Sequence, residues 1–362
     1  MDPPAGYSFV TNNNSNIYNN LARFDFSYQL QGAVGKLLPL QLLLSLSKSH
    51  KETNYTTYSI THVVADKRDW ILDMANELPF LLAGGERKTA IMKDYLRSLL
   101  LAPNCKGVIC WVKAGASAFV DSLGTEFSDK VHVVYWGKKS KKRSPKLQEN
   151  KLTLLFINSA NINIERHFFG KGGMSVVYAF LKLKRRYPNL NLVIRSGMSS
   201  GLQSRLNSIS GVKVISTILP SSELDRIWSD ADIFVLPNYG NTPASVLLDA
   251  MSYGLPIVTT DIWANPELVE GGKSGLLVHS HMMDEYVDGN ILHLESSNFL
   301  RAIYSRDEKF VDSLAKAISL LVEDESLRRR MGDYNYKLVA NGKFSVEERN
   351  SRLKRVLDAT LS

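Results

Sequence analysis

The chain has 362 residues, of which 44% are hydrophobic, so it can bury a large core, and its length predicts about two domains. Its formal charge of +8 and its isoelectric point near 9.2 suit an anionic ligand or surface, but an excess of this size favours no class of partner. The two cysteines, Cys105 and Cys110, are too few for a disulfide framework and predict reduced thiols.

The sequence lacks two patterns that would assign it to a membrane or to a secretory route. No charged segment followed by an apolar one opens the chain, and no run of 18 apolar residues occurs in it. We therefore expect a soluble, cytoplasmic protein with at most a peripheral membrane contact.

The first part of the chain alternates between predicted strands and helices. An irregular arm over residues 1–30 and a buried apolar helix over 37–46 come first. Strands are then expected at 58–64, 106–112 and 130–136, a strand or an apolar turn at 69–74, and helices at 87–101 and 114–124. Such alternation is typical of βαβ units around a parallel sheet.

Residues 137–150, GKKSKKRSPKLQEN, interrupt this pattern. The segment is basic, contains Pro145 and has no apolar face, so it is interpreted as a linker. A charge run of this kind is usually solvated, while a phosphate-binding or membrane-binding patch is the alternative.

A second alternating series follows. Strands are expected at 151–158, 191–197, 212–219 and 232–237, with helices at 172–187 and 221–231. Ser222 and Asp225 are expected to open the second of these helices. The fold class is therefore α/β, with Rossmann-like domains over residues 1–148 and 149–342 and a ligand at the carboxyl ends of the strands.

The stretch from Leu236 to Val278 is the predicted centre of function. It combines a strand end, a Gly/Pro loop, a short helix, a second strand, another helix and a final strand. A helix that starts directly after such a loop offers free N–H groups to an anion.

The C-terminal region is predicted to be helical. An inserted segment at 279–308 precedes helices near 309–322 and 326–340. Ser345 and Glu348 form a capping-box pattern before a last helix, within 343–362, that is expected to pack back on the N-terminal domain.

The second half of the chain resembles the retaining family-4 glycosyltransferases of the GT-B fold. The matching segments lie within 151–278 and are LTLLFIN, KGGMSVVYAFLKLKRRYPNLNLVI, SSELDRIWSDADIFVLP and VLLDAMSYGLPIVTTDIWANPELVEGGKSGLLV. The first domain is similar to the family only weakly, from DWILDMANELPF to KVHVVYW. The resemblance implies two Rossmann-like domains that face each other across a sugar-nucleotide cleft.

In this family, two acids separated by seven residues bracket the loop and helix after the LP strand. The first falls on Asn241 here and the second on Asp249. By resemblance, Asp249 would hold the ribose hydroxyls and Asn241 the hydroxyls of the donor sugar, with Thr242 and Pro243 starting the helix between them. An amide at 241 should weaken or retune the sugar contact, since hydrogen bonds to charged acceptors are the stronger ones.

The resemblance also assigns cations to the diphosphate. Lys171, within GKGG, matches the phosphate-binding lysine of the family, and Gly172 would allow a close approach of backbone and phosphate. The partner arginine of the family follows the preceding strand, where this chain has Asn158 and Ser159, so Arg166 is the nearest replacement. The further donor-binding positions implied are Ser159, Leu219, Asn238, Gly240, Thr242, Ala244 and Ser245.

Other kinds of site are disfavoured. His279, His281, Asp284 and Glu285 lie in a polar segment without further ligands, so no metal is expected there, and no G-x-G-x-x-G follows a strand. The resemblance implies transfer of a hexose, of mannose or glucose type, from a GDP- or UDP-sugar to a hydroxyl acceptor with retention, without metal, cofactor or nucleic acid. A catalytically silent nucleotide-sugar-binding scaffold and a sugar-nucleotide epimerase are the alternatives. The sequence identifies neither the acceptor nor the oligomeric state.

Overall fold

The protein consists of two compact units. The structure, a computed structural model, describes residues 4–5, 56–60, 63, 68–74, 86–142, 151–159, 165–240, 245–280 and 297–361, without the side chains of 86–92 and 297–298. The first unit comprises residues 1–135 and 350–362, and the second comprises residues 136–349. The predicted helix at 37–46, nearly all of the predicted arm and part of the insertion lie outside the described residues.

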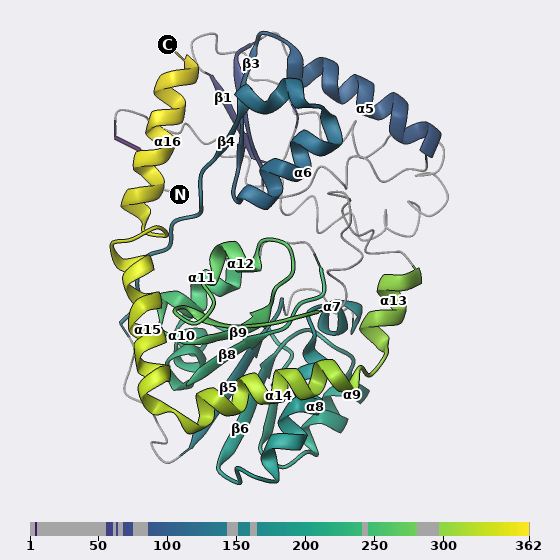
Figure 1. Ribbon diagram of the computed structural model, residues 1–362, viewed down its shortest axis with the longest axis vertical. Helices are drawn as coiled ribbons and strands as arrows, with labels where there is room; N and C mark the ends of the chain where they lie inside the picture. Colours follow the sequence, from purple (N-terminus) through teal and green to yellow (C-terminus); the bar gives the residue numbers. More distant parts are fainter. Residues whose placement is uncertain are drawn as a thin grey trace. The chain divides into compact units, whose positions relative to one another are not determined.

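The first unit contains a parallel sheet in the order β1-β2-β3-β4 (Figure 1). Its strands are β1 (Thr57–Ile60), β2 (Trp70–Met74), β3 (Cys105–Cys110) and β4 (Val131–Val133). The helices α5 (Glu86–Leu101) and α6 (Lys113–Leu123) and the 3₁₀ helix η1 (Thr125–Lys130) connect the later strands. The predicted βαβ alternation is therefore present in this unit.

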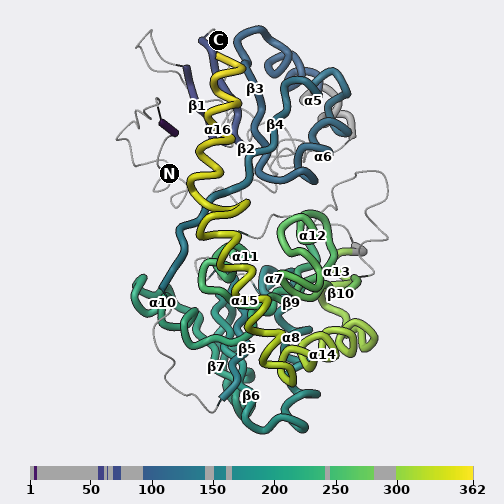
Figure 2. The backbone as a smooth tube through the Cα atoms, turned by 60° about the vertical axis from the view of Figure 1, so that its left-hand side comes forward, coloured from purple at the N-terminus to yellow at the C-terminus, as the bar shows by residue number. Residues whose placement is uncertain are grey.

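Successive residues of β2 supply apolar side chains to two separate clusters. Trp70 and Leu72 belong to the cluster that contains Phe119, whereas Ile71 packs with Leu353 of α16 (Val346–Leu361) in the other. This division follows from the strand geometry, because neighbouring side chains point to opposite faces of a sheet. Figure 2 shows α16 running along this sheet.

The second unit contains a six-stranded parallel sheet in the order β10-β9-β8-β5-β6-β7. Its strands are β5 (Leu152–Ile157), β6 (Leu190–Arg195), β7 (Val212–Ile215), β8 (Ile233–Leu236), β9 (Ile257–Thr260) and β10 (Gly275–Val278). The chain builds outward from β5 to β7 and then crosses to β8 on the other side of β5. The strand order thus reverses between β5 and β8, which is the switch point where open α/β sheets bind ligands.

Helices connect and cover the strands of the second unit. They are α7 (Glu165–Gly170), α8 (Gly173–Lys184), α9 (Ser200–Asn207), α10 (Ser221–Asp230), α11 (Ser245–Ser252), α12 (Asn265–Leu268), α13 (Ser297–Tyr304), α14 (Glu308–Glu323) and α15 (Glu325–Ala340). Helices α8 and α14 pack together, as do α11 and α15 (Figure 1). No helix within the described residues is long and apolar enough to cross a membrane.

Several elements of the structure differ from the sequence-based predictions. Helix α9 was not predicted, because only Leu206 on it is buried and its apolar pattern is weak. Helix α10 begins at Ser221 after Pro220, without a side-chain cap, so the predicted opening by Ser222 and Asp225 is wrong. Residues 137–142, predicted to belong to a linker, are part of the second unit.

Backbone hydrogen bonds hold this basic segment on the second unit. The N–H of Lys138 donates to the carbonyl of Phe344 at 2.9 Å, and that of Lys141 donates to the carbonyl of Ser252 at 3.0 Å. The boundary between the units therefore falls after residue 135 rather than after 148. For residues 137–142 the linker prediction is wrong, because polarity alone cannot distinguish a solvated segment from one that is held through its backbone, and residues 143–150 lie outside the described part of the chain.

The last helix begins as its sequence predicts. The N–H of Glu348 donates to the hydroxyl oxygen of Ser345 at 3.1 Å, which confirms one half of the predicted capping box. Residues 346–349 of α16 belong to the second unit and residues 350–361 to the first.

Because α16 contributes Leu353 to the core of the first unit, a Leu353→Ala variant should be destabilised. Leu353 is fully buried beside Ile71, Ile109 and Val134, so its truncation should lower the free energy of unfolding by about 2–5 kcal/mol. Urea denaturation measures this change. Ser351→Ala, at an exposed position of the same helix, should shift the free energy by less than about 0.5 kcal/mol, and equal effects of both variants would contradict the packing.

Candidate functional site

A cavity of about 640 Å³ lies in the second unit at the carboxyl ends of its central strands. Ile157 and Leu236 line it from the last positions of β5 and β8, the two strands between which the strand order reverses. The remaining lining residues are Lys138, Lys139, Lys141, Asn158, Ser159, Lys171, Arg195, Ser221, Leu224, Asp225, Trp228, Ser245, Val246, Asp249, Ser252 and Tyr253. The cavity thus lies where open α/β sheets usually bind their ligands.

The close approach of α8 to the end of β8 shapes one side of the cavity. Gly172 precedes α8 with a φ of 75°, in the left-handed region that suits glycine. A Cβ at this position would lie 2.2 Å from the carbonyl oxygen of Pro237. The N–H of Tyr239 donates to the carbonyl of Gly170 at 2.9 Å, which joins the same two segments. The GKGG sequence therefore places Lys171 at the cavity.

Lys171 is a desolvated cation at this position. It lines the cavity, is only partly exposed, and burial lowers its pKa from 10.5 to about 8. The lysine is therefore mostly protonated at pH 7 and titrates just above it. An anion beside it would favour the charged form.

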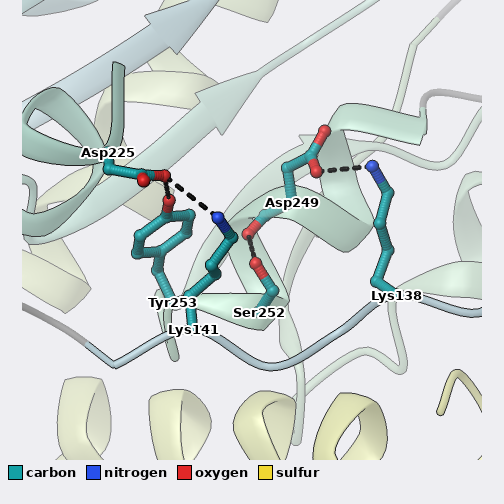
Figure 3. A network of polar contacts seen from close by, with 6 residues as sticks. All are labelled: Lys138, Lys141, Asp225, Asp249, Ser252 and Tyr253. Carbon is teal, nitrogen blue, oxygen red and sulfur yellow. Dashed lines mark hydrogen bonds and ion pairs between the residues drawn. The ribbon is translucent and has the colours of Figure 1, made fainter. Parts of the chain in front are cut away.

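Asp249 projects from α11 toward the basic segment (Figure 3). One of its carboxylate oxygens accepts a hydrogen bond from Nζ of Lys138 at 2.6 Å. The two side chains are about one-third exposed, at 35% for Asp249 and 34% for Lys138. The ion pair is therefore accessible from the cavity side and contributes little to stability on its own.

A second carboxylate of the cavity is held by a hydroxyl group and a lysine. Asp225 of α10 accepts a hydrogen bond from the hydroxyl of Tyr253 and another from Nζ of Lys141 at 3.3 Å (Figure 3). These two partners lower the pKa of Asp225, while burial and the carboxylate raise that of Tyr253. The Tyr253 ring stacks on Trp228 at 5.6 Å between centroids, which fixes the hydroxyl toward Asp225.

Arg195, the last residue of β6, supplies another cation to the cavity. Its Nη1 donates to the carbonyl oxygen of Asn158 at 3.2 Å. Burial lowers the pKa of its guanidinium group, but an arginine stays charged at neutral pH.

The cavity is therefore electropositive. Five basic residues line it, at 138, 139, 141, 171 and 195, against the two carboxylates of Asp225 and Asp249. Hydroxyl groups of Ser159, Ser221 and Ser245 add hydrogen-bonding capacity. Such a lining suits an anionic ligand that also carries hydroxyl groups.

The structure brings several predicted site residues together. Lys171, Ser159, Ser245 and Asp249 all line the cavity, and Gly172 positions one side of it. Asn241, Thr242, Pro243 and Ala244 lie outside the described residues, and α11 is described from Ser245 onward.

Other predicted donor-binding residues do not line the cavity. Neither Arg166 of α7 nor Leu219 is among the lining residues. Asn238 and Gly240 are buried, and the Asn238 amide donates to the carbonyl of Gly240 at 3.0 Å. The amide oxygen of Asn238 accepts from Asn265 at 2.8 Å, so this side chain joins the loop to α12.

The sequence did not reveal Lys138, Lys141, Asp225, Tyr253 or Arg195 as cavity residues. The charge run at 137–150 was a signal for the two lysines, since a phosphate-binding patch was its alternative interpretation. Asp225 of α10 and Tyr253, which follows α11, are 28 positions apart and meet only in the folded chain.

His279, considered from the sequence as a metal ligand, contacts a carboxylate of another segment. Nδ1 of His279 lies 2.7 Å from a carboxylate oxygen of Asp261. His281, Asp284 and Glu285 lie outside the described residues. Within the described part of the chain, no group of three or more His, Cys, Asp or Glu side chains is arranged to hold a metal ion.

Comparison with known proteins relates this region to glycosyltransferases. Residues 166–295 match the family described as glycosyl transferases group 1. A D-inositol 3-phosphate glycosyltransferase from Corynebacterium jeikeium is 30% identical over 175 residues, which is 45% of this chain and 35% of that protein. An alpha-maltose-1-phosphate synthase from Mycolicibacterium smegmatis is 27% identical over 155 residues, 40% of this chain and 34% of that protein. The chain thus aligns with about a third of the length of these relatives.

Solved structures show the same fold. Sucrose-phosphate synthase from Thermosynechococcus elongatus aligns with a TM-score of 0.57 and 16% identity over 81% of this chain and 68% of that one. Anabaena Alr3699/HepE in complex with UDP and glucose aligns with a TM-score of 0.60 and 16% identity over 91% and 83%. The chain accordingly has the α/β fold of the GT-B glycosyltransferases, with two Rossmann-like domains.

A Gly172→Ala variant should disturb the side of the cavity next to Lys171. The left-handed φ costs alanine about 1–2 kcal/mol, and the backbone contact with Pro237 forces a further shift, so we expect a loss of at least about 2 kcal/mol in the free energy of unfolding. Urea denaturation measures the loss.

Gly201→Ala is the matched control for this substitution. Gly201 lies in α9, and no atom lies within 4 Å of a Cβ built there. Alanine should leave the stability unchanged or raise it by up to about 1 kcal/mol. Equal stability of the two variants would contradict the close approach of α8 to the end of β8.

Proposed function

We propose that this protein is a retaining glycosyltransferase that transfers a hexose from a GDP- or UDP-sugar to a hydroxyl acceptor. The observation that carries the proposal is the electropositive cavity at the strand-order reversal, where Lys171 and Asp249 lie together. A sugar nucleotide combines the two properties that this lining suits, a charged diphosphate and a set of hydroxyl groups. The family match over residues 166–295 supports the same reaction class.

Lys171 is the proposed electrostatic catalyst. Negative charge grows on the diphosphate as the glycosidic bond breaks, and a positioned cation in a desolvated site stabilises that charge. The acceptor hydroxyl attacks from the face of the departing diphosphate, and a phosphate oxygen receives its proton. This route retains the anomeric configuration and uses neither a metal nor a covalent protein nucleophile.

Asp249 is the proposed ribose-binding residue, and Asn241 the proposed contact for the donor sugar. The Asp249 carboxylate accepts a hydrogen bond from Lys138 at 2.6 Å. A carboxylate offers several acceptor positions, so ribose hydroxyls can share it with Lys138 or displace the lysine.

UDP is the first nucleotide to test. The structural neighbour Anabaena Alr3699/HepE contains UDP and glucose, and a pneumococcal O-GlcNAc transferase, GtfA, contains UDP and GlcNAc, with a TM-score of 0.55 to this chain. The relatives named for D-inositol 3-phosphate and for the synthesis of maltose 1-phosphate suggest phosphorylated polyhydroxy compounds, D-inositol 3-phosphate among them, as the first acceptors to test.

Single-turnover incubation with sugar-labelled UDP-glucose or GDP-mannose tests the proposal. We expect label on an added acceptor, or released as free sugar by slow hydrolysis, because the cavity stabilises the leaving diphosphate. A changed sugar still attached to the nucleotide would indicate an epimerase instead. Donor that binds and remains unaltered would indicate a catalytically silent binding protein.

Calorimetry with the Asp249→Asn variant tests how the donor binds. If Asp249 holds the ribose, UDP and UDP-glucose should lose affinity by the same factor in calorimetry. Asp312→Asn, on the exposed surface of α14, should leave both affinities unchanged. Loss of affinity for UDP-glucose alone would indicate that Asp249 binds the donor sugar and not the ribose.

Nucleoside diphosphate binding should also weaken as the pH rises through the pKa of Lys171. With a pKa of about 8, the protonated fraction falls about fourfold between pH 7 and 8.5, and the affinity for UDP should fall by up to the same factor. Calorimetry at both pH values measures the change. Lys171→Arg should abolish the pH dependence, whereas Lys213→Arg, at an exposed position of β7, should retain it. A persistent slope in Lys171→Arg would exclude Lys171 as its source.

A further inference from the structure

Arg195 lies beside the end of β5, although it belongs to the neighbouring strand. In the parallel register of the two strands Arg195 pairs with Ile157, and its carbonyl accepts the N–H of Asn158 at 2.8 Å. Adjacent strands are about 4.8 Å apart, so an arginine side chain from β6 reaches the space directly beyond β5. It enters the cavity there, where Asn158, Ser159 and Lys171 are also lining residues.

The guanidinium group of Arg195 is incompletely satisfied. Its Nη1 donates to a neutral acceptor, the carbonyl of Asn158 at 3.2 Å, while Nε is buried without a hydrogen-bond partner in the described structure. Among the described residues no carboxylate forms an ion pair with Arg195. The two carboxylates of the cavity, Asp249 and Asp225, are instead engaged by Lys138 and Lys141.

This arrangement of the Arg195 guanidinium group is unfavourable. A partly buried charge without a counter-ion costs free energy, and so does a buried N–H group without an acceptor. A ligand that presents several anionic oxygens would repay both costs. A phosphate group has this property, and the planar fork of arginine matches it with two parallel hydrogen bonds.

We infer that Arg195 is the second phosphate-binding cation of the site, acting with Lys171 on the diphosphate of the donor. This assignment rests on the proposed function. It also rests on the position of Arg195 at the end of β6, where its side chain lines the cavity together with Asn158 and Ser159. Arg166, the replacement expected from sequence, is not among the residues that line the cavity. The register of β6 against β5 places the positive charge of Arg195 next to the end of β5.

A purely structural role makes a different prediction. If Arg195 only ties β6 to the Asn158 carbonyl, its substitution would lower stability without changing which ligands bind. If it binds phosphate, the loss must depend on the number of phosphate groups in the ligand.

Calorimetry on the full chain with UDP, GDP and inorganic pyrophosphate tests the inference, together with ligand-observed NMR for uridine and guanosine. Arg195→Met should weaken each diphosphate by about tenfold or more, the scale of one charged hydrogen bond, and leave the nucleosides within about twofold. Arg195→Lys, which keeps the charge but loses the fork, should give an intermediate loss. Arg205→Met removes the same charge from an exposed position of α9 and should change none of these affinities.

The outcomes separate this inference from the proposed function. Diphosphates that bind equally well to the wild type and to Arg195→Met overturn the role of Arg195 and leave the glycosyltransferase proposal standing. Pyrophosphate binding that requires Arg195, with no binding of UDP, GDP or their sugars, supports the cation and overturns the proposed function. Absence of all binding overturns both. If Arg195→Met does not fold, as judged by circular dichroism, Arg195→Lys decides in the same way.

Discussion

The contact between Gly172 and the carbonyl of Pro237 is the constraint on which the candidate site depends. Reversal of strand order between β5 and β8 leaves space beyond their carboxyl ends, but an open space alone recognises nothing. The left-handed turn at Gly172 brings the start of α8 against the end of β8, at a distance that excludes any side chain. Lys171 is thereby held in a desolvated position at the cavity, and its lowered pKa is the electrostatic consequence.

Local sequence was sufficient for the residues whose position depends on one turn. The family resemblance carried by GKGG predicted Lys171 and Gly172 at the site, and both residues lie in the short turn between α7 and α8. Ser345 and Glu348 predicted a helix start through their capping-box pattern. Helix α9 carries a comparable signal, since the hydroxyl of Ser199 accepts the N–H of Leu202 at 3.3 Å, but its single buried side chain left no apolar period to detect.

Residues placed by tertiary structure could not be found in this way. Arg195 reaches the cavity through the register of β6 against β5, and Lys138 does so through a backbone bond to Phe344 more than 200 positions away. At Asp225 the local sequence pattern and the tertiary contacts favour different roles. Its spacing from Ser222 suited a helix cap, but the carboxylate instead meets Tyr253 and Lys141, which a single helix cannot predict. The predicted alternation of strands and helices is present in the structure, because each element is encoded by its own pattern of buried residues.

The charges of the cavity fall into two classes with different consequences for a ligand. The pairs of Lys138 with Asp249 and of Lys141 with Asp225 are one-third to one-half exposed, and ion pairs of this kind contribute at most about 1 kcal/mol. Ribose or sugar hydroxyls can therefore displace or share these partners at little cost. Burial lowers the pKa of both Lys171 and Arg195, so an anion near them interacts in a medium of lower effective dielectric than water. Lys171 and Arg195 would thus fix the position of the diphosphate, while the exposed ion pairs adjust around the rest of the donor.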